Sequence, residues 1–534
     1  MKKFFALLLT LIMVLSMVAC GGGKQEEPAK TDEPPAKTEQ PAPSEDAKIK
    51  ETLRIGFDED LPSGNPYNDT ITATATFTNL TFNTLIYIDP DDGSINPELA
   101  TEWTDVNGDG LVWDLKLVEG ATFHNGNAFT ADDVKFTVEY ATDPNNCTKT
   151  IAGPGIDAID SIEVVSDYVV RFNLNTSTPD FVSYLEQKMY DKESFDTLAK
   201  EEASIIGTGP YYFNRDMTQT GVQFTATRYD NYWGGAENHP TKNLTFVYYP
   251  SSDTQVAALQ AGEIDVMAWV PVASLIPTLQ ADSNIIVDQT NGAFSYYLAG
   301  NYRKDFFDDP EVRKAFMMAI DKDALVAVAY DGGAGGSASY NFCAPVGLGH
   351  DPDVKVVGYD PEAAKEILEA KGLVGKKFNI FYPGLAVNKA MCEVVQSCFA
   401  AVGVELEIMS RDVTNWMALK ASEEYDFYID CCAYQGALLY NYGRFFGEAG
   451  SANLYVYESD EYMAAQAKVT EKGNFDEMVA EFSNLQKFVA EDLPILPLCY
   501  NTATAACRTN VYGAADALAP TLNFCDYSQV YATE

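Results

Sequence analysis

The chain has 534 residues, of which 46% are hydrophobic and 21% charged, an ordinary composition for a protein of roughly three to four domain-sized units. Acidic residues dominate, with 78 Asp and Glu against 36 Lys and Arg and a formal net charge of −42. Such a surface repels phosphate backbones and anionic head groups, which argues strongly against a nucleic-acid-binding protein. The only histidines are His124, His239 and His350, too few and too scattered for a His-rich site.

The first segment predicts a signal peptide over residues 1–19. Lys2 and Lys3 precede an apolar stretch from Phe4 to Val18 that is too short for a membrane-spanning helix. Met17 to Gly21 resembles a bacterial lipobox, although Met17 stands where Leu is usual, and this resemblance implies that Cys20 is lipidated. Plain secretion, with Cys20 as an incidental thiol, is the alternative. No later apolar run reaches 18 residues, so no internal membrane span is expected.

Residues 20–51 predict a lipidated Cys followed by a disordered tether. Between Gly21 and Lys48 there is no Ile, Leu, Val, Phe, Trp or Tyr, so this stretch buries too little apolar area to offset the entropy of ordering. The folded body is therefore expected outside the cell, held to the outer face of its membrane by the lipid alone.

The body alternates between strand and helix patterns, which predicts an α/β protein with open sheets. Asp309-Pro310-Glu311 and Asp360-Pro361-Glu362 each supply an N-cap and a Pro in the first turn of a helix. Two helices end at a Gly and lead into a strand. The expected strands are 53–57, 113–117, 263–266 and 404–408, and the expected helices begin at 310 and 361 and span 254–261 and 389–401.

Two glycine-containing segments allow a second interpretation. Asp105 to Gly110 has the start of a calcium loop, but position twelve is Lys116 instead of a carboxylate, and Asn-Gly with Asp-Gly favours a β-hairpin. Gly332 to Gly336 lacks the Lys-Ser/Thr of a nucleotide loop, so a loop after a helix is expected.

The cysteines predict neither a disulfide framework nor a metal site. Nine remain after Cys20, an odd number, and none forms a Cys-x-x-Cys pair. We expect buried free thiols, no metal and no cofactor. No Gly-x-Ser-x-Gly segment is present to hold a nucleophile.

Seven segments resemble, in the right order, the extracytoplasmic solute-binding proteins of ABC importers, family 5, which includes dipeptide-, oligopeptide- and nickel-binding proteins. The resemblance covers about residues 52 to 500. The segments are Pro97–Trp103 (P-x-L-A-x-x-W), Leu111–Asp133 with its F-H-x-G turn and T-A-x-D, Gly207–Tyr211 (G-T-G-P-Y), Asn231–Gly234 (N-x-Y-W-G less one residue), Ala258–Asp265 (A-L-x-x-G-E-I-D), Asp309–Asp321 and Tyr359–Pro361.

The resemblance implies a two-lobed periplasmic-binding-protein-like fold (class II, cluster C) with an extra domain inserted beside lobe I. Domain I would comprise residues 52–80, 205–290 and 500–534, domain II 81–204, and domain III 291–499. The implied function is capture of a peptide-like solute between domains I and III and delivery to the subunits of a permease. The protein would be a monomer, would bind no nucleic acid and would not be an enzyme.

The resemblance also implies which residues contact the ligand. In peptide binders of the family, an Asp shortly after a Y/F-D-x strand holds the α-ammonium of the peptide. Here that strand begins at Tyr425-Asp426, and the anchoring position falls at or near Gln435, which carries no charge. Either the register slips by a few residues, with Asp430 as the nearest acid, or the ligand lacks a free α-ammonium. The expected lining of the cleft is Tyr296, Asn301, Trp416, Tyr434, Gln435 and Tyr440.

Two other functions stay open at this point. A binder of a chelated metal of the nickel type, or of another non-peptide solute, would share the same fold. A secreted acidic hydrolase belongs to a different class and would reveal itself by turnover of peptides or glycans.

Overall fold

The computed structural model describes residues 47–61, 63–68, 72–89, 94–330, 332–433, 438–447, 450–472, 474–519 and 525–534. Cys20, with the predicted signal peptide and most of the tether, lies outside the described residues. Within the described ranges, no helix combines the length and apolar character that crossing a membrane requires.

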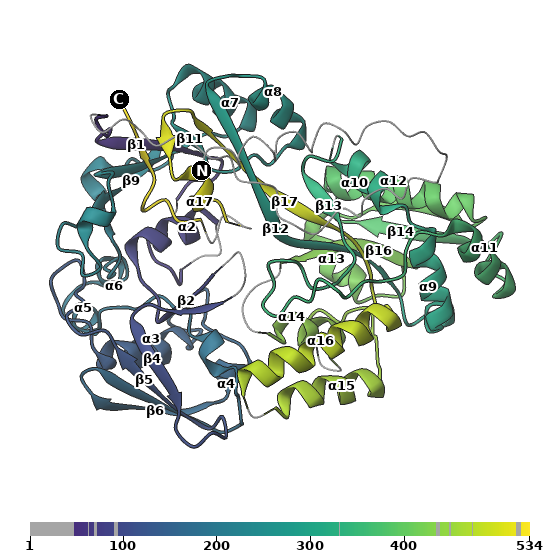
Figure 1. Ribbon diagram of the computed structural model, residues 1–534, viewed down its shortest axis with the longest axis horizontal. Helices are drawn as coiled ribbons and strands as arrows, with labels where there is room; N and C mark the ends of the chain where they lie inside the picture. The colour runs from purple at the N-terminus through teal and green to yellow at the C-terminus, as the bar shows by residue number, and fades with distance from the viewer. Residues whose placement is uncertain are drawn as a thin grey trace, which may run out of the picture. The chain divides into compact units, whose positions relative to one another are not determined.

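An eleven-stranded mixed sheet runs through the described chain (Figure 1). Its order is β15-β14-β16-β12-β17-β11-β1-β10-β9-β8, and β13 pairs with β17. Both parallel and antiparallel neighbours occur, which confirms the predicted α/β class. The strands are β1 (Thr52–Phe57), β8 (Tyr211–Phe213), β9 (Gln223–Arg228), β10 (Asn243–Tyr248), β11 (Val266–Met267), β12 (Ile285–Gly300), β13 (Gly336–Ala338), β14 (Lys377–Tyr382), β15 (Glu405–Ser410), β16 (Phe427–Ala433) and β17 (Leu496–Arg508).

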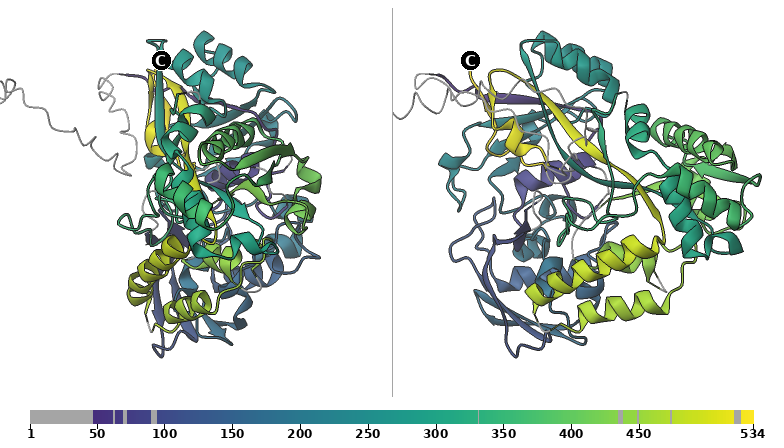
Figure 2. Two further views of the ribbon diagram at one scale, coloured as in Figure 1. Left: turned by 90° about the vertical axis from the view of Figure 1, so that its right-hand side faces the viewer. Right: turned by 45° about the vertical axis from the view of Figure 1, so that its right-hand side comes forward.

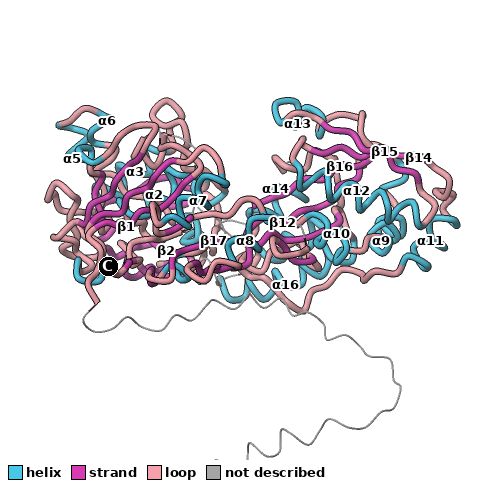
Figure 3. The backbone as a smooth tube through the Cα atoms, turned by 90° about the horizontal axis from the view of Figure 1, so that it is seen from above, coloured by secondary structure: helices cyan, strands magenta, loops and turns pink. Residues whose placement is uncertain are grey.

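Strands β12 and β17 belong to both halves of this sheet (Figure 3). Residues 285–291 of β12 pair with residues 502–508 of β17, where β17 also pairs with β11. Farther along, β12 pairs with residues 496–500 of β17 on one side and with β16 on the other. One pair of strands therefore joins two groups of elements.

Each group has hydrophobic cores of its own. Two clusters of buried residues draw only on residues 297–500. Another draws on 53–80, 211–268 and 507–532, and a fourth on 67–190. The boundaries of the three domains remain a prediction, but these cores lie on either side of the β12–β17 pair.

A second sheet of four strands, in the order β4-β5-β7-β6, lies inside the segment expected to form the inserted domain. Its first hairpin confirms the interpretation of Asp105 to Gly110: the Asp105 carboxylate accepts hydrogen bonds from the backbone N–H of Gly108 (3.0 Å) and of Gly110 (2.7 Å). Both glycines have positive φ, +71° and +69°. The remaining strands are β2 (Ile86–Ile88), β3 (Ile95–Pro97), β4 (Ala100–Asp105), β5 (Val112–Leu117), β6 (Ile159–Ser166), β7 (Val169–Leu174), β18 (Val511–Tyr512) and β19 (Tyr531–Ala532).

The helices begin where the capping residues predict. The Asp309 side chain accepts from the N–H of Glu311, with Pro310 in the first turn of α9, and Asp360 caps α11 in the same way. The α-helices are α2 (Thr72–Thr81), α3 (Ala131–Ala141), α4 (Pro154–Asp157), α5 (Lys192–Thr197), α6 (Lys200–Ala203), α7 (Ser252–Ala261), α8 (Ile276–Gln280), α9 (Pro310–Ala319), α10 (Lys322–Ala329), α11 (Pro361–Ala370), α12 (Ala386–Ala401), α13 (Val413–Lys420), α14 (Tyr440–Phe446), α15 (Asp460–Thr470), α16 (Phe475–Asp492) and α17 (Ala514–Ala517). Short 3₁₀ turns are η1 (Phe181–Tyr184), η2 (Arg215–Met217), η3 (Ala236–Asn238), η4 (Ala273–Leu275) and η5 (Asp305–Phe307).

The strand expected at 263–266 is wrong at its start, because β11 covers only Val266–Met267. The N–H groups of Glu263 and Ile264 still bond to the carbonyl of Ala258 and close helix α7. The carboxylate of Asp265 then accepts from the backbone N–H of Arg54 at 3.0 Å. The chain becomes a strand only after these capping contacts.

The segments that carry the family resemblance converge on one buried side chain, Asn83. Its Oδ1 accepts from Trp233 Nε1 at 3.1 Å, and its Nδ2 donates to Glu98 Oε1 at 2.6 Å. Its backbone N–H donates to the hydroxyl of Thr208 at 3.2 Å. Three sequence motifs therefore meet where the four-stranded sheet's segment joins the large sheet.

Two glycines of the G-T-G-P-Y segment pack closely against the end of α2. A Cβ on Gly207 would lie 2.0 Å from the carbonyl oxygen of Thr81, and one on Gly209 would lie 2.5 Å from that of Leu80. His124, of the F-H-x-G turn, has its Nε2 3.0 Å from the carbonyl oxygen of Gly209. Gly207, Gly209 and His124 therefore join the G-T-G-P-Y segment to the end of α2 and to the F-H-x-G turn.

The β12–β17 ladder is interrupted between Asn291 and Ser295. Inside this interruption the Asn501 side chain accepts a hydrogen bond from the Phe294 N–H at 2.9 Å. A Cβ on Gly292 would lie 2.0 Å from the same Asn501 Oδ1, so the amide occupies the space that a side chain at 292 would need. Asn501 thus supplies the acceptor that the interrupted ladder lacks.

We expect Gly292→Ala to lower the free energy of unfolding by about 1–3 kcal/mol, because the added methyl group displaces the Asn501 amide from the Phe294 N–H. Urea denaturation would measure the effect. Asn501→Ala alone should cost a similar amount, whereas the double variant should cost less than the sum of the two, since the methyl group then fits the vacated space. If the losses of unfolding free energy of the two single variants simply add in the double variant, the contact between Gly292 and the Asn501 amide does not stabilise the interruption.

Candidate functional site

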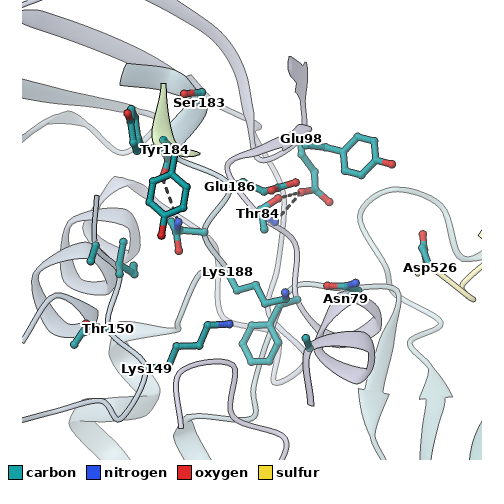
Figure 4. A pocket seen from close by; sticks show the side chains of 17 residues that line it. Asn79, Thr84, Glu98, Lys149, Thr150, Ser183, Tyr184, Glu186, Lys188 and Asp526 are labelled. Carbon is teal, nitrogen blue, oxygen red and sulfur yellow. Dashed lines mark hydrogen bonds between the residues drawn. The ribbon is translucent and has the colours of Figure 1, made fainter. Parts of the chain in front are cut away.

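A cavity of about 410 Å³ lies beside helix α2 and the segment 183–188, with one residue contributed by α14 (Figure 4). Its volume is typical of small-molecule sites, which range over about 300–1,000 Å³. We call it the charged pocket, because its lining includes three carboxyl groups and two ammonium groups: Glu98, Glu186, Asp526, Lys149 and Lys188.

The backbone around Lys188 is held from two sides. Thr84 and Lys188 form an isolated antiparallel bridge, and the Lys188 carbonyl accepts from the Tyr67 hydroxyl at 2.8 Å. Glu186 and Lys188 stand two residues apart in non-helical chain, and both line the pocket, while the next residue, Met189, is fully buried. The fold thus fixes the main chain and leaves the two charged side chains to face the cavity.

Glu98 is held in place by three hydrogen bonds. Its carboxylate accepts from Asn83 Nδ2 at 2.6 Å, from the Thr84 N–H at 2.7 Å and from the Thr84 hydroxyl at 2.5 Å. Burial nevertheless raises the pKa of Glu98, and the nearby Asp526 adds to the rise against these bonds. Burial also raises the pKa of Asp526, although Ser528 donates to it from both its N–H and its hydroxyl.

Lys188 and Glu186 are shifted in opposite directions. Burial, with the positive charge of Lys149, lowers the pKa of Lys188 to about 8, and Glu186 and Glu98 offset part of this shift. Burial raises the pKa of Glu186 to about 7. A ligand that brings an ammonium and a carboxylate would favour the charged form of each group it approaches.

A second cavity of about 400 Å³ adjoins the first and shares Asn79, Glu98 and Asp526 with it. The wall of this cavity includes Tyr232 and His239. The two cavities meet at the three residues that they share, at the junction between α2, the Glu98 loop and the C-terminal segment.

Of the six predicted site residues, Tyr440 lines the charged pocket. It is the first residue of α14, and the Arg444 guanidinium carbon lies 5.1 Å from the centroid of its ring. Tyr434 and Gln435 lie outside the described residues.

Tyr296, Asn301 and Trp416 lie in the half of the sheet that contains β16, and within the described chain none of them lines the charged pocket. Tyr296 sits on β12 opposite Cys431. Asn301 is fully buried, and its Nδ2 donates to the carbonyls of Ser422 (3.1 Å) and Tyr425 (3.0 Å). Their part in ligand binding stays a prediction.

Trp416 contacts Asp430, the residue expected as the alternative anchor for a ligand ammonium. Trp416 Nε1 donates to Asp430 Oδ2 at 2.9 Å, and Lys420 Nζ bonds to the same oxygen at 2.7 Å. Cys431 N–H donates to the other oxygen at 2.9 Å. The Asp430 carboxylate therefore already has protein partners on both oxygens.

Sequence reasoning missed the charged groups of the pocket. Glu98 lies in the Pro97–Trp103 motif, but nothing in that motif shows whether its residues contact a ligand or only stabilise the fold. The local sequence around Lys188, Glu-Gln-Lys-Met-Tyr, predicts an exposed lysine. Its position at the pocket depends on contacts with distant segments, such as the hydrogen bond from Tyr67, 121 residues away.

The cysteines are as expected within the described residues. All nine are free thiols, and seven of them are buried. Burial raises the pKa of Cys431 to about 12, which keeps that thiol protonated and unreactive.

Two groups of elements joined by β12 and β17 (Figure 2), with a cavity of small-molecule size lined from α2, the segment 183–188 and α14, match the architecture expected of a two-lobed solute-binding protein. The model of the bacterial extracellular solute-binding proteins, family 5, matches residues 94–437. The chain belongs to this family.

Curated relatives and solved structures agree with this assignment. The chain is 25% identical over 472 residues to heme-binding protein A of Haemophilus influenzae, covering 81% of this chain and 84% of that protein. It is 28% identical over 362 residues to the dipeptide-binding protein of Escherichia coli, covering 62% and 66%. The ABC transporter substrate-binding protein CtaP of Listeria monocytogenes has the same fold, with a TM-score of 0.80, 23% identity and coverage of 91% and 100%. The predicted two-lobed fold is thereby confirmed.

We expect Lys188→Met to raise the free energy of unfolding at pH 7 by about 1–3 kcal/mol, because one unit of pKa difference corresponds to about 1.4 kcal/mol. Below about pH 8 the lysine is charged in both the folded and the unfolded chain, and the cost of burying the charge is fully present. Between pH 8 and the ordinary pKa of 10.5 the folded protein loses the proton first, so the advantage of the variant should vanish.

Urea denaturation from pH 7 to pH 11 would test this. Lys389→Met is the matched control, because Lys389 lies on α12 and pairs with Glu393 at the surface, so its loss should change stability little. A Lys188→Met variant that is less stable than the parent at pH 7 would contradict the prediction.

Proposed function

We propose that the protein is the substrate-binding component of an ABC importer and that it captures a peptide-like solute and delivers it to permease subunits. The observation that carries this proposal is the charged pocket, which offers carboxyl and ammonium groups to one small ligand beside Tyr440. A short peptide is a zwitterion, with an ammonium at one end and a carboxylate at the other. The relative named a dipeptide-binding protein supports the same ligand class.

Two other ligand classes occur in the family, and the pocket favours the peptide over both. Heme, named for one relative, is a broad apolar ring that carries carboxylates but no ammonium, whereas three carboxyl groups and two ammonium groups line this cavity. For a metal chelate, histidines are the expected contacts. Here His124, His239 and His350 each bond to a main-chain carbonyl, and the described residues hold no cluster of three or more His, Cys, Asp or Glu able to bind a metal.

Capture would involve movement of the two groups of elements about the β12–β17 pair. The proposed domains are I (52–80, 205–290, 500–534), II (81–204) and III (291–499), with the ligand enclosed between I and III. Most of the lining of the charged pocket, including Lys149 and Lys188, belongs to the proposed domain II, so the ligand would also contact that domain. Tyr440 would supply the contact from domain III. The protein acts as a monomer and hydrolyses nothing.

We further propose that the protein works outside the cell, anchored to the outer face of the membrane by lipid on Cys20. The lipobox-like sequence and the polar tether that follows support this placement. The tether would let the folded body reach the permease without a membrane-spanning helix.

Calorimetry with di-, tri- and tetra-alanine is expected to detect binding of at least one of these peptides. Tyr440→Ala should weaken it about tenfold, because the aromatic wall is lost. Tyr359→Ala, a change at a half-exposed ring that does not line the pocket, is the control and should leave affinity unchanged. Binding of none of the three peptides, or recovery of cleaved peptide by chromatography, would overturn the proposed function.

Cys20→Ala should release the protein from the membrane fraction into the medium, because the acceptor of the lipid is absent. Cell fractionation with immunoblotting would measure the distribution. Cys398→Ala, which removes another of the ten cysteines, is the matched control and should stay with the membrane. A Cys20→Ala protein that sediments with membranes as fully as the parent would refute the anchor.

A further inference from the structure

Among the residues that the structure describes, the Lys188 ammonium has no protein partner, although the chain is rich in carboxylates. Within the described residues its ammonium takes part in no ion pair or hydrogen bond, and its pKa responds to other charges only at a distance. Other partly buried lysines are paired: Lys304 with Asp426 at 2.6 Å and Lys420 with Asp430 at 2.7 Å. With 78 acidic residues available against 36 basic ones, the missing partner of Lys188 is a specific feature of this position.

The unpaired ammonium points into the charged pocket. Lys149 and Lys188 extend toward the same space in Figure 4, and the charge of Lys149 lowers the pKa of Lys188, so the two are electrostatic neighbours. Both line the cavity. Two neighbouring ammonium groups in a concave, partly desolvated site form a receptor for an anionic group.

The same cavity limits what that anion can be. Glu98, Glu186 and Asp526 share the lining, and a doubly charged phosphate would face three carboxyl groups as well as the two lysines. A singly charged carboxylate faces less repulsion. If its molecule also carries an ammonium, that group finds Glu98 and Asp526, which border both cavities. The ligand chemistry that matches the whole lining is a carboxylate at one end and an ammonium at the other.

We propose that Lys188, assisted by Lys149, binds the terminal carboxylate of the ligand, and that Glu98 and Asp526 receive its ammonium. This assignment rests on the proposed function and names the end groups by which the pocket selects its ligand. The ion pair that Lys188 lacks in the protein is then completed by the ligand. It also leaves Gln435, uncharged at the position expected to anchor the ammonium, free of that task.

The test compares tri-alanine with tri-alanine amide, which lacks the terminal charge, by calorimetry at pH 7. The parent protein should bind the free acid about ten- to a hundredfold more tightly than the amide, as expected for a charge-assisted hydrogen bond. Lys188→Met should lose most of this preference by weakening binding of the free acid alone. Lys389→Met, a change at an exposed lysine that does not line the pocket, should keep the preference.

The outcomes separate the two proposals. If the parent protein binds neither compound, the proposed function fails for peptides and this assignment fails with it. If it binds both equally, or if Lys188→Met keeps the preference for the free acid, peptides are ligands but their carboxylate lies elsewhere. The comparison on the parent protein needs no variant, so it holds even if Lys188→Met fails to fold.

Discussion

Main-chain pairing between β12 and β17 is the constraint on which the rest of the structure depends. These strands are part of both halves of the large sheet, while the hydrophobic cores lie to either side of them. A change in the angle between the halves therefore requires the two strands to bend or twist and leaves each core packed. The ladder is interrupted between Asn291 and Ser295, where an interruption permits the greatest local twist. The Asn501 amide satisfies the Phe294 N–H there, so this flexibility leaves no buried donor unpaired.

A second constraint is the junction around Asn83, where the motif residues Glu98, Thr208 and Trp233 meet. Their hydrogen bonds join segments that are far apart in the sequence. The Glu98 carboxylate bonds to Asn83 at this junction and also borders the two cavities. A residue of this junction can therefore both hold the fold together and face a ligand.

The sequence was sufficient for features that depend on local chemistry or on whole-chain resemblance. The caps at Asp309 and Asp360 and the Asp105 hairpin involve contacts within a few residues. The strand expected at 263–266 is wrong at residues 263–265, where contacts to Ala258 and Arg54 replace strand pairing. Tyr440 was predicted for the cleft and lines the pocket, whereas Lys188 was missed because its burial depends on segments more than a hundred residues away. Tyr434 and Gln435 remain predictions.

The unpaired lysine connects stability with function. A buried ammonium without a partner destabilises the folded chain, and proteins keep such groups mainly where function requires them. A carboxylate bound to Lys188 would relieve that cost, so part of the stability missing from the free protein would return when ligand binds. A ligand without the matching charge would leave the half-buried ammonium unpaired, and an unpaired charge costs more in a partly desolvated pocket than at the surface. Under this proposal, selectivity for the ligand's end groups follows from the same partial burial that makes an unpaired Lys188 unfavourable.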